Sequence, residues 1–179
     1  SAHMKQVEKT AKSDERVKNC MTYWTEVRYG RSIRAREVPD LLDEEIRGFT
    51  EFSEFENMIN QLIEFSIFYK MLNTNKELTL PGFIQHRRVL GFSDKKSQSW
   101  TSQHMRLYTA MSCGERPSKE IDLVMSAVEW VSIRGGWSQI SNKLENIYPK
   151  YANMAINGVN LDDWFDDFVA SLTRVLDNV

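Results

Sequence analysis

The segment from Thr50 to Leu72 constrains the fold more than any other stretch of this chain. Its second half, Leu62–Leu72, is apolar on nearly every side of a helix, with Glu64 and Lys70 as charged interruptions. A helix that is apolar all round is normally buried inside a bundle or a membrane, and this one is too short to span a bilayer. We therefore expect Leu62–Leu72 to form the enclosed centre of a helical bundle.

Glycine and proline are scarce, with eight Gly and four Pro among 179 residues. This argues against a turn-rich all-β fold and favours long helices. No segment of four to eight residues alternates cleanly between apolar and polar positions, as a half-buried strand would. A chain of this length favours one domain. The sequence predicts an all-α, single-domain bundle of about six to eight helices.

The chain is expected to divide into two parts, a tag remnant and flexible basic arm at 1–16 and a helical domain at 17–179. Ser1–Met4 resembles the scar of a cleaved purification tag. Lys5–Lys18 has little apolar content, which favours a frayed helix or a disordered arm.

Caps and helical spacing mark the expected helices. Asp40 is expected to cap the second, Ser53 or Thr50 the third and Asn160 the last, while Pro149 is expected to end a helix. The expected spans are 17–30, 40–48, 53–72, 81–90, 100–112, 117–134, 137–148, a turn at 152–156, and 160–176.

Composition is that of a soluble protein, with a formal net charge of −2 and 41% apolar residues. No segment is long and apolar enough to be a signal peptide or a membrane span. Cys20 and Cys113 do not form a disulfide framework and are expected to be free thiols, which points to an intracellular protein.

No motif of a known catalytic class is present: there is no Gly-rich phosphate loop, no His-Glu-x-x-His and no nucleophile elbow. The acidic run Asp162–Asp167 places pairs of carboxylates on one helical face, but further cation ligands are not evident nearby. We expect no enzyme activity, no cofactor and no metal site.

A basic segment from Gly82 to Lys119 provides an alternative function. It carries seven Lys or Arg against two acids, with Phe and Trp side chains interleaved. Phosphate neutralisation combined with aromatic stacking is typical of single-stranded nucleic-acid binding. The residues predicted to contact nucleic acid are Arg87, Arg88, Lys95, Lys96 and Arg106.

The segment Trp130–Ile140, with Gly135, Gly136 and Trp137 at its centre, resembles the BH2 region of Bcl-2-type helical bundles. The resemblance covers about a dozen residues, and the Asn-Trp-Gly-Arg and Leu-x-x-x-Gly-Asp motifs of that family are missing. It implies a more remote alternative, a Bcl-2-like regulator whose hydrophobic groove holds an amphipathic helix.

The leading hypothesis is a non-enzymatic protein-interaction module: an adaptor, a regulator or a subunit of a larger assembly. Its partner is expected to be another protein or a second copy of the chain, because five Trp, nine Phe and eight Met can fill a core and leave apolar surface for a partner. Blocks of opposite charge also alternate along the sequence, and these either steer association or cancel each other within the fold. Lys5–Arg36 has nine basic and four acidic residues, whereas Glu37–Glu56 has eight acidic residues and one Arg. The residues predicted to bind the partner lie on the terminal helix: Trp164, Phe165, Phe168 and Leu172.

Overall fold

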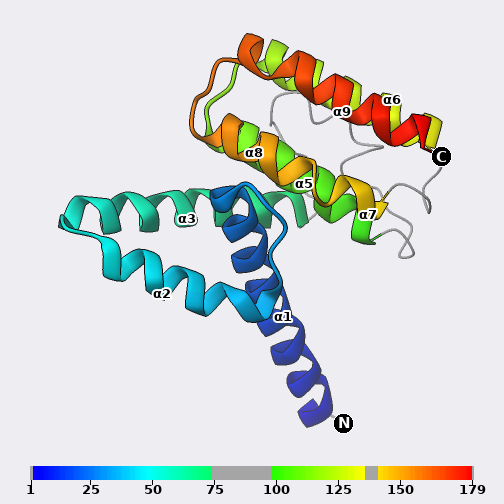
Figure 1. Ribbon diagram of the computed structural model, residues 1–179. Helices are drawn as coiled ribbons and strands as arrows, with labels where there is room; N and C mark the ends of the chain where they lie inside the picture. Colours follow the sequence, from blue (N-terminus) through cyan, green and yellow to red (C-terminus); the bar gives the residue numbers. More distant parts are fainter. Residues whose placement is uncertain (1, 74–97, 136–140, 179) are drawn as a thin grey trace.

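The computed structural model describes residues 2–73, 98–135 and 141–178, and every regular element in these ranges is a helix (Figure 1). The all-α fold class is confirmed. The helices are α1 (Ala2–Tyr29), η1 (Ala35–Glu37), α2 (Val38–Gly48), α3 (Phe52–Asn73), α5 (Gln98–Cys113), α6 (Ser118–Gly135), α7 (Ser141–Leu144), α8 (Tyr148–Ile156), η2 (Leu161–Asp163) and α9 (Phe165–Asp177).

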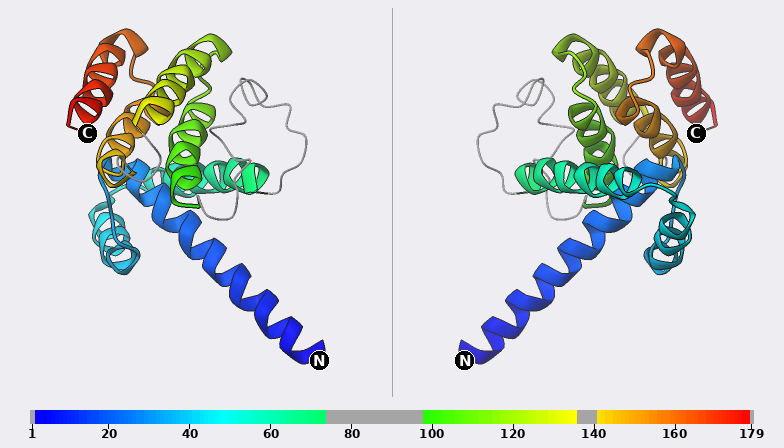
Figure 2. Two further views of the ribbon diagram at one scale, coloured as in Figure 1. Left: turned by 90° about the vertical axis from the view of Figure 1, so that its right-hand side faces the viewer. Right: turned by 90° about the vertical axis from the view of Figure 1, so that its left-hand side faces the viewer.

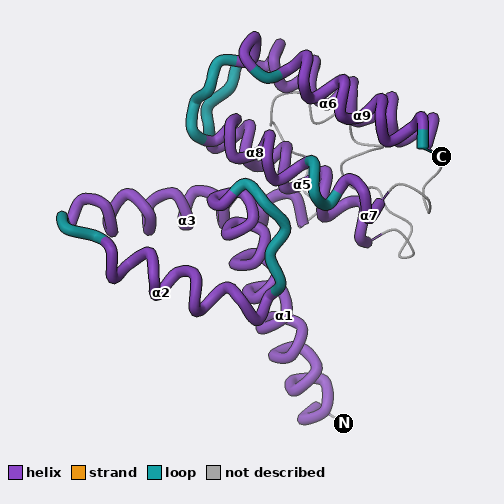
Figure 3. The backbone as a smooth tube through the Cα atoms, in the orientation of Figure 1, coloured by secondary structure: helices purple, strands orange, loops and turns teal. Residues whose placement is uncertain are grey.

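Four helices form the main body. α5 packs along α8, and α6 packs along α9. The loops that join α5 to α6 and α8 to α9 lie side by side at one end of this body (Figure 3). The Arg116 guanidinium ties them together by donating a hydrogen bond of 2.7 Å to the Val159 carbonyl.

The N-terminal helices pack against the side of this body that α5 and α8 form. The C-terminal part of α1 contacts α3, α5 and α8, and α3 also packs on α5. α2 and α3 meet at the turn between them, and the N-terminal half of α1 projects away from all other helices (Figures 1 and 2). A single core joins the two groups; its largest members are Trp24, Tyr108, Tyr148, Tyr151, Trp164, Phe65 and Phe168.

The expectation that Leu62–Leu72 is enclosed on all sides is wrong. Phe65 is fully buried, but Ile63 and Ile67 are 51% and 53% exposed. α3 packs on α1 and α5 from one side only, so its opposite face is in contact with solvent. The fold class did not depend on that enclosure, because most of the core comes from α5, α6, α8 and α9 instead.

Several helix boundaries also differ from expectation. α1 begins at Ala2 rather than near residue 17. Asp40 lies inside α2 rather than at its cap, and Pro149 is in the first turn of α8 instead of ending a helix. Proline fits the first turn of α2 (Pro39) and of α8 (Pro149), because backbone N–H groups in the first turn of a helix have no partner within the helix. The helix expected at 81–90 lies outside the described residues.

Within the described part of the chain, none of the helices combines the length and the apolar character that crossing a bilayer requires.

Candidate docking surface on α3

The outer face of α3 carries a row of apolar side chains that we call the α3 stripe: Phe52, Ile59, Ile63 and Ile67. Their spacings of seven, four and four residues keep them on one side of a helix. Phe52 is 76% exposed, Ile63 and Ile67 are about half exposed, and Ile59 is half-buried. The stripe extends over about 22 Å at 1.5 Å per residue. Several exposed large apolar side chains on one face of a helix are typical of an interaction site.

The inner face of α3 fixes the orientation of the stripe. Met58 and Phe65 are buried in the core, and Phe65 stacks on Tyr69 with ring centroids 6.5 Å apart. Tyr69 in turn meets Tyr23 of α1 edge-on at 5.8 Å. These contacts hold one face of α3 inward, so the stripe must point outward.

The start of α3 is held by a carboxylate cap. Glu54 Oε2 accepts hydrogen bonds from the backbone N–H groups of Thr50 and Glu51, each 2.9 Å long. These backbone bonds hold the pKa of Glu54 below its ordinary value. The cap therefore comes from the Glu54 side chain and not from the expected Ser53 or Thr50, and it leaves Phe52 exposed as the first residue of α3.

A polar network at the end of α1 fixes α2 and α3 relative to each other. Arg28 pairs with Glu45 of α2, and its Nη1 donates 3.1 Å to Gln61 Oε1 of α3. The Tyr29 hydroxyl donates 2.7 Å to Glu45. Burial works against ionisation of Glu45, yet the hydrogen bonds from Arg28 and Tyr29 hold its pKa below the ordinary value. Glu45 is therefore a stable anion that joins three helices.

The surroundings of the stripe are acidic. Residues 37–56, which make up α2 and the start of α3, carry eight acids and one Arg. The exposed carboxylates nearest in sequence to the stripe are Glu51, Glu54 and Glu56 of this region, together with Glu64 further along α3. An apolar row with acidic side chains on the same helix favours a partner that is both apolar and cationic.

A second group of exposed apolar side chains lies on α6. It consists of Leu123, Trp130 and Ile133, of which Ile133 is 75% exposed. No comparable block of acidic residues accompanies it, since Lys119 and Arg134 are exposed on the same helix. An exposed isoleucine on this helix, Ile133, provides a matched control for substitutions in the α3 stripe.

A buried ion pair joins α1 to α5. Arg106 Nη1 lies 2.9 Å from Glu26 Oε2, and the two side chains are only 9% and 5% exposed. The Tyr23 ring covers the guanidinium with its centroid 3.9 Å from Cζ, a cation–π contact. Burial raises the pKa of Glu26 to about 7, although Arg106 and the Ile33 N–H both act to lower it.

The predicted nucleic-acid residues meet different outcomes. Arg87, Arg88, Lys95 and Lys96 lie outside the described residues. Arg106 is buried in an ion pair with Glu26, so in this arrangement its guanidinium is not exposed as contact with a phosphate backbone would require.

The predicted partner-binding residues lie in the interior of the protein. Trp164, Phe168 and Leu172 are buried, and Phe165 is half-buried against the same core. Phe168 meets Tyr151 of α8 edge-on at 5.0 Å. In this arrangement these side chains do not form an exposed surface, and a partner would reach them only if α9 detached.

The acidic run before and within α9 is used for packing. Asp167 accepts hydrogen bonds from Lys150 at 2.9 Å and from Tyr151 at 2.6 Å, which connect α8 to α9. Asp162, Asp163 and Asp166 are exposed. The described residues contain no group of three or more side chains placed to hold a metal ion.

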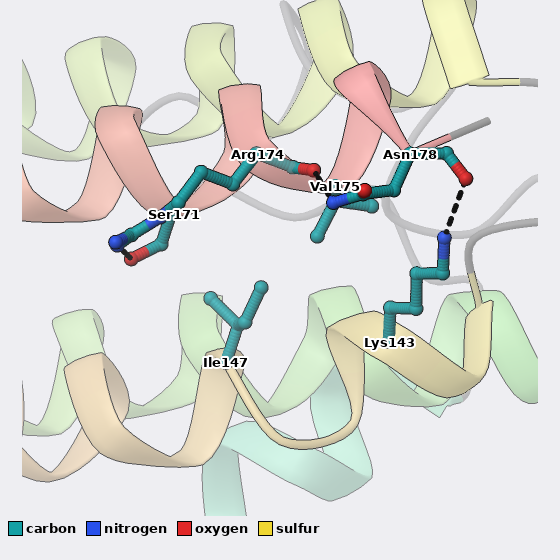
Figure 4. Close-up of a pocket in the computed structure, with 6 residues that line it drawn as sticks. All are labelled: Lys143, Ile147, Ser171, Arg174, Val175 and Asn178. Atoms are coloured by element: carbon teal, nitrogen blue, oxygen red, sulfur yellow. Dashed lines mark hydrogen bonds between the residues drawn. The ribbon is translucent and has the colours of Figure 1, made fainter.

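A pocket of about 340 Å³ lies between α7 and the end of α9 (Figure 4). Its two cations are already engaged: Lys143 donates 3.1 Å to the Asn178 carbonyl, and Arg174 donates 3.0 Å to Ser171. Ile147 and Val175 contribute apolar surface. The pocket is a short space with mixed polar and apolar lining, unlike the long apolar groove that the Bcl-2 resemblance implies. The Gly136–Ile140 part of that resemblance lies outside the described residues.

Sequence reasoning missed both the α3 stripe and the Glu26–Arg106 pair. A signal for the stripe was present, since Glu56, Asn60 and Glu64 fall on the same side of the helix as Ile63. No local signal marks the ion pair, because its members are eighty positions apart in the chain.

Comparison with known proteins returned no match to a family model, to a curated protein or to a solved structure.

Proposed function

We propose that this protein is a non-enzymatic interaction module that docks a partner on the α3 stripe. The observation that carries the proposal is the exposure of Phe52, Ile63 and Ile67 on one face of a helix whose other face is firmly packed. An exposed apolar row of this length on a packed helix can pair with the apolar face of an amphipathic helix, whose anchors also repeat every three or four residues.

The partner is a segment of another protein with apolar anchors flanked by Lys or Arg. The apolar anchors would cover the stripe, and the basic residues would face the acidic block at 37–56. Such charge pairing at a rim increases the association rate and selects the partner, while the buried anchors supply most of the affinity.

Binding of a synthetic amphipathic helix tests this proposal. The probe is a fluorescent peptide with Leu on one face and Lys on the other, and its counterpart has every Lys replaced by Glu. We expect the Lys peptide to bind and the Glu peptide not to. Affinity for the Lys peptide should fall between about 50 and 200 mM salt, because the rim contacts are screened.

Matched variants locate the site. The double substitution Ile63→Asp with Ile67→Asp should reduce affinity by about 30-fold or more, as loss of central anchors does. Ile133→Asp on α6 also places a charge on an exposed isoleucine and should leave affinity unchanged. Equal affinity of the stripe variant and the wild type, or absence of Lys-peptide binding, would overturn the proposal.

A further inference from the structure

The Glu26–Arg106 pair is buried but poorly hydrogen-bonded. Glu26 Oε2 is 2.9 Å from Arg106 Nη1, yet neither Oε2 nor Arg106 Nε has an aligned hydrogen-bond partner. Glu26 Oε1 accepts one bond, from the Ile33 N–H, at 3.3 Å. A buried carboxylate normally needs several good hydrogen bonds to remain charged.

The charged groups around Glu26 do not compensate fully. Arg106 from α5 favours ionisation, whereas Glu145, between α7 and α8, opposes it. Arg28, the other cation in this part of α1, is paired with Glu45 of α2, and Tyr23 covers the Arg106 guanidinium.

The pair lies where a change in it can alter the contact between the two groups of helices. α1 belongs to the group that carries α2 and the α3 stripe, and α5 belongs to the main body. The Ile33 bond also fixes the turn after α1 that leads into α2. A change in this pair therefore acts on the contact between the two groups of helices (Figure 2).

We propose that the Glu26–Arg106 pair is a proton-operated latch, in which protonated Glu26 favours the closed contact of α1 with α5 and ionised Glu26 weakens it. When Glu26 is neutral, the cost of burying an incompletely solvated anion disappears, and Tyr23 still covers the guanidinium. When Glu26 ionises, an open arrangement that exposes its carboxylate to water becomes more stable relative to the closed arrangement. This regulation goes beyond the proposed docking function and does not depend on it.

The direction of the pH effect follows from proton linkage. With a folded pKa of about 7 and an ordinary value of 4.5, the closed state binds more protons than the open state between these pH values. The ratio of closed to open molecules should fall as pH rises through this window, by roughly 300-fold at most, and should level off above it.

The test is hydrogen exchange on the full chain from pH 5 to pH 8, corrected for the intrinsic pH dependence of exchange. We expect amides in the C-terminal part of α1 and in α5 to lose protection as pH rises. Denaturant unfolding of the same samples should show stability falling in parallel.

Two variants show whether Glu26 causes the pH dependence, because histidines also change charge in this range. Glu26→Gln, which imitates the neutral acid, should remove most of the pH dependence and be more stable than the wild type at pH 8. Glu44→Gln, at an exposed position on α2, should behave as the wild type does.

A wild type whose protection is constant from pH 5 to pH 8 would overturn the latch whether or not the variants fold. So would a Glu26→Gln variant that keeps the full pH dependence, or one that is less stable than the wild type at every pH.

Discussion

At the residue scale, the two cysteines illustrate what burial does to chemistry. Cys20 and Cys113 are free and buried. Burial raises the pKa of Cys20 to about 11, and it raises the pKa of Cys113 as well, with the nearby Glu64 charge contributing. Because the thiolate is the reactive form, both thiols should be inert near neutral pH.

We therefore predict slow modification of both cysteines by a chromogenic disulfide reagent at pH 7.5, and rapid modification of both after denaturation. The colour change measures each rate directly. A thiol in the folded protein that reacts as fast as free cysteine would contradict the burial described here.

Asn153 makes a long-range contact that ends α1. Its side-chain amide donates 2.7 Å to the Arg28 carbonyl, from 125 positions away in the chain. Asn153→Ala should cost about 1–2 kcal/mol, because a half-buried carbonyl loses its partner.

The matched control is Asn157→Ala on the same helix. Its amide donates to the Asn153 carbonyl one turn earlier and is exposed, so its loss should cost about 0.5 kcal/mol or less. Urea denaturation of the two variants measures the difference, and equal losses would contradict the bridging role of Asn153.

Individual contacts of this kind could not be predicted from sequence. Arg106 looked like a phosphate ligand because its neighbours in the chain are basic and aromatic, and only the fold brings Glu26 against it. Phe168 was correctly placed on an apolar helix face, whereas Trp164 lies just before α9, and sequence does not say whether the protein itself covers these side chains.

At the scale of elements, α3 is a two-faced helix, and substitution on each face tests this. Phe65→Ala should cost about 3–5 kcal/mol, as removal of a fully buried aromatic ring does. Ile67→Ala, two positions away on the exposed face, should change stability by no more than about 0.5 kcal/mol. Similar losses in urea denaturation would mean that α3 is enclosed after all.

The contact between the ends of α5 and α8 depends on a glycine. A Cβ atom at Gly114 would overlap the Ala155 carbonyl oxygen, whereas one at Gly48 in α2 would meet nothing within 4 Å. Gly114→Ala should destabilise the protein by about 1–3 kcal/mol. Gly48→Ala should be neutral or slightly stabilising, and a neutral Gly114→Ala in thermal melts would contradict the close approach.

Helix boundaries were predictable where the residue at the boundary has a single structural role. Pro117 before α6 and Gly48 at the end of α2 were read correctly. Pro149 was misread, because proline both ends helices and begins them. α3 was wrongly predicted to be enclosed, because its second half is apolar on both faces. The few polar residues on its exposed face give only a weak periodic signal in such an apolar segment.

At the scale of the whole molecule, the all-α class was predictable because it rests on many residues at once: few glycines and prolines, and repeated helical spacing. The arrangement of the helices was not, because the helix-to-helix contacts that define it are long-range. These contacts bury the terminal helix and leave the α3 stripe exposed beside the acidic block at 37–56.

The most direct test of this account is photochemical footprinting of the protein with and without the Lys amphipathic peptide. The account predicts that a diazirine reagent labels Ile63, Ile67 and Ile133 of the free protein, and that the peptide protects only Ile63 and Ile67. Labelling of Ile63 and Ile67 no stronger than that of buried Phe65, or no protection of them at saturating peptide, would contradict it.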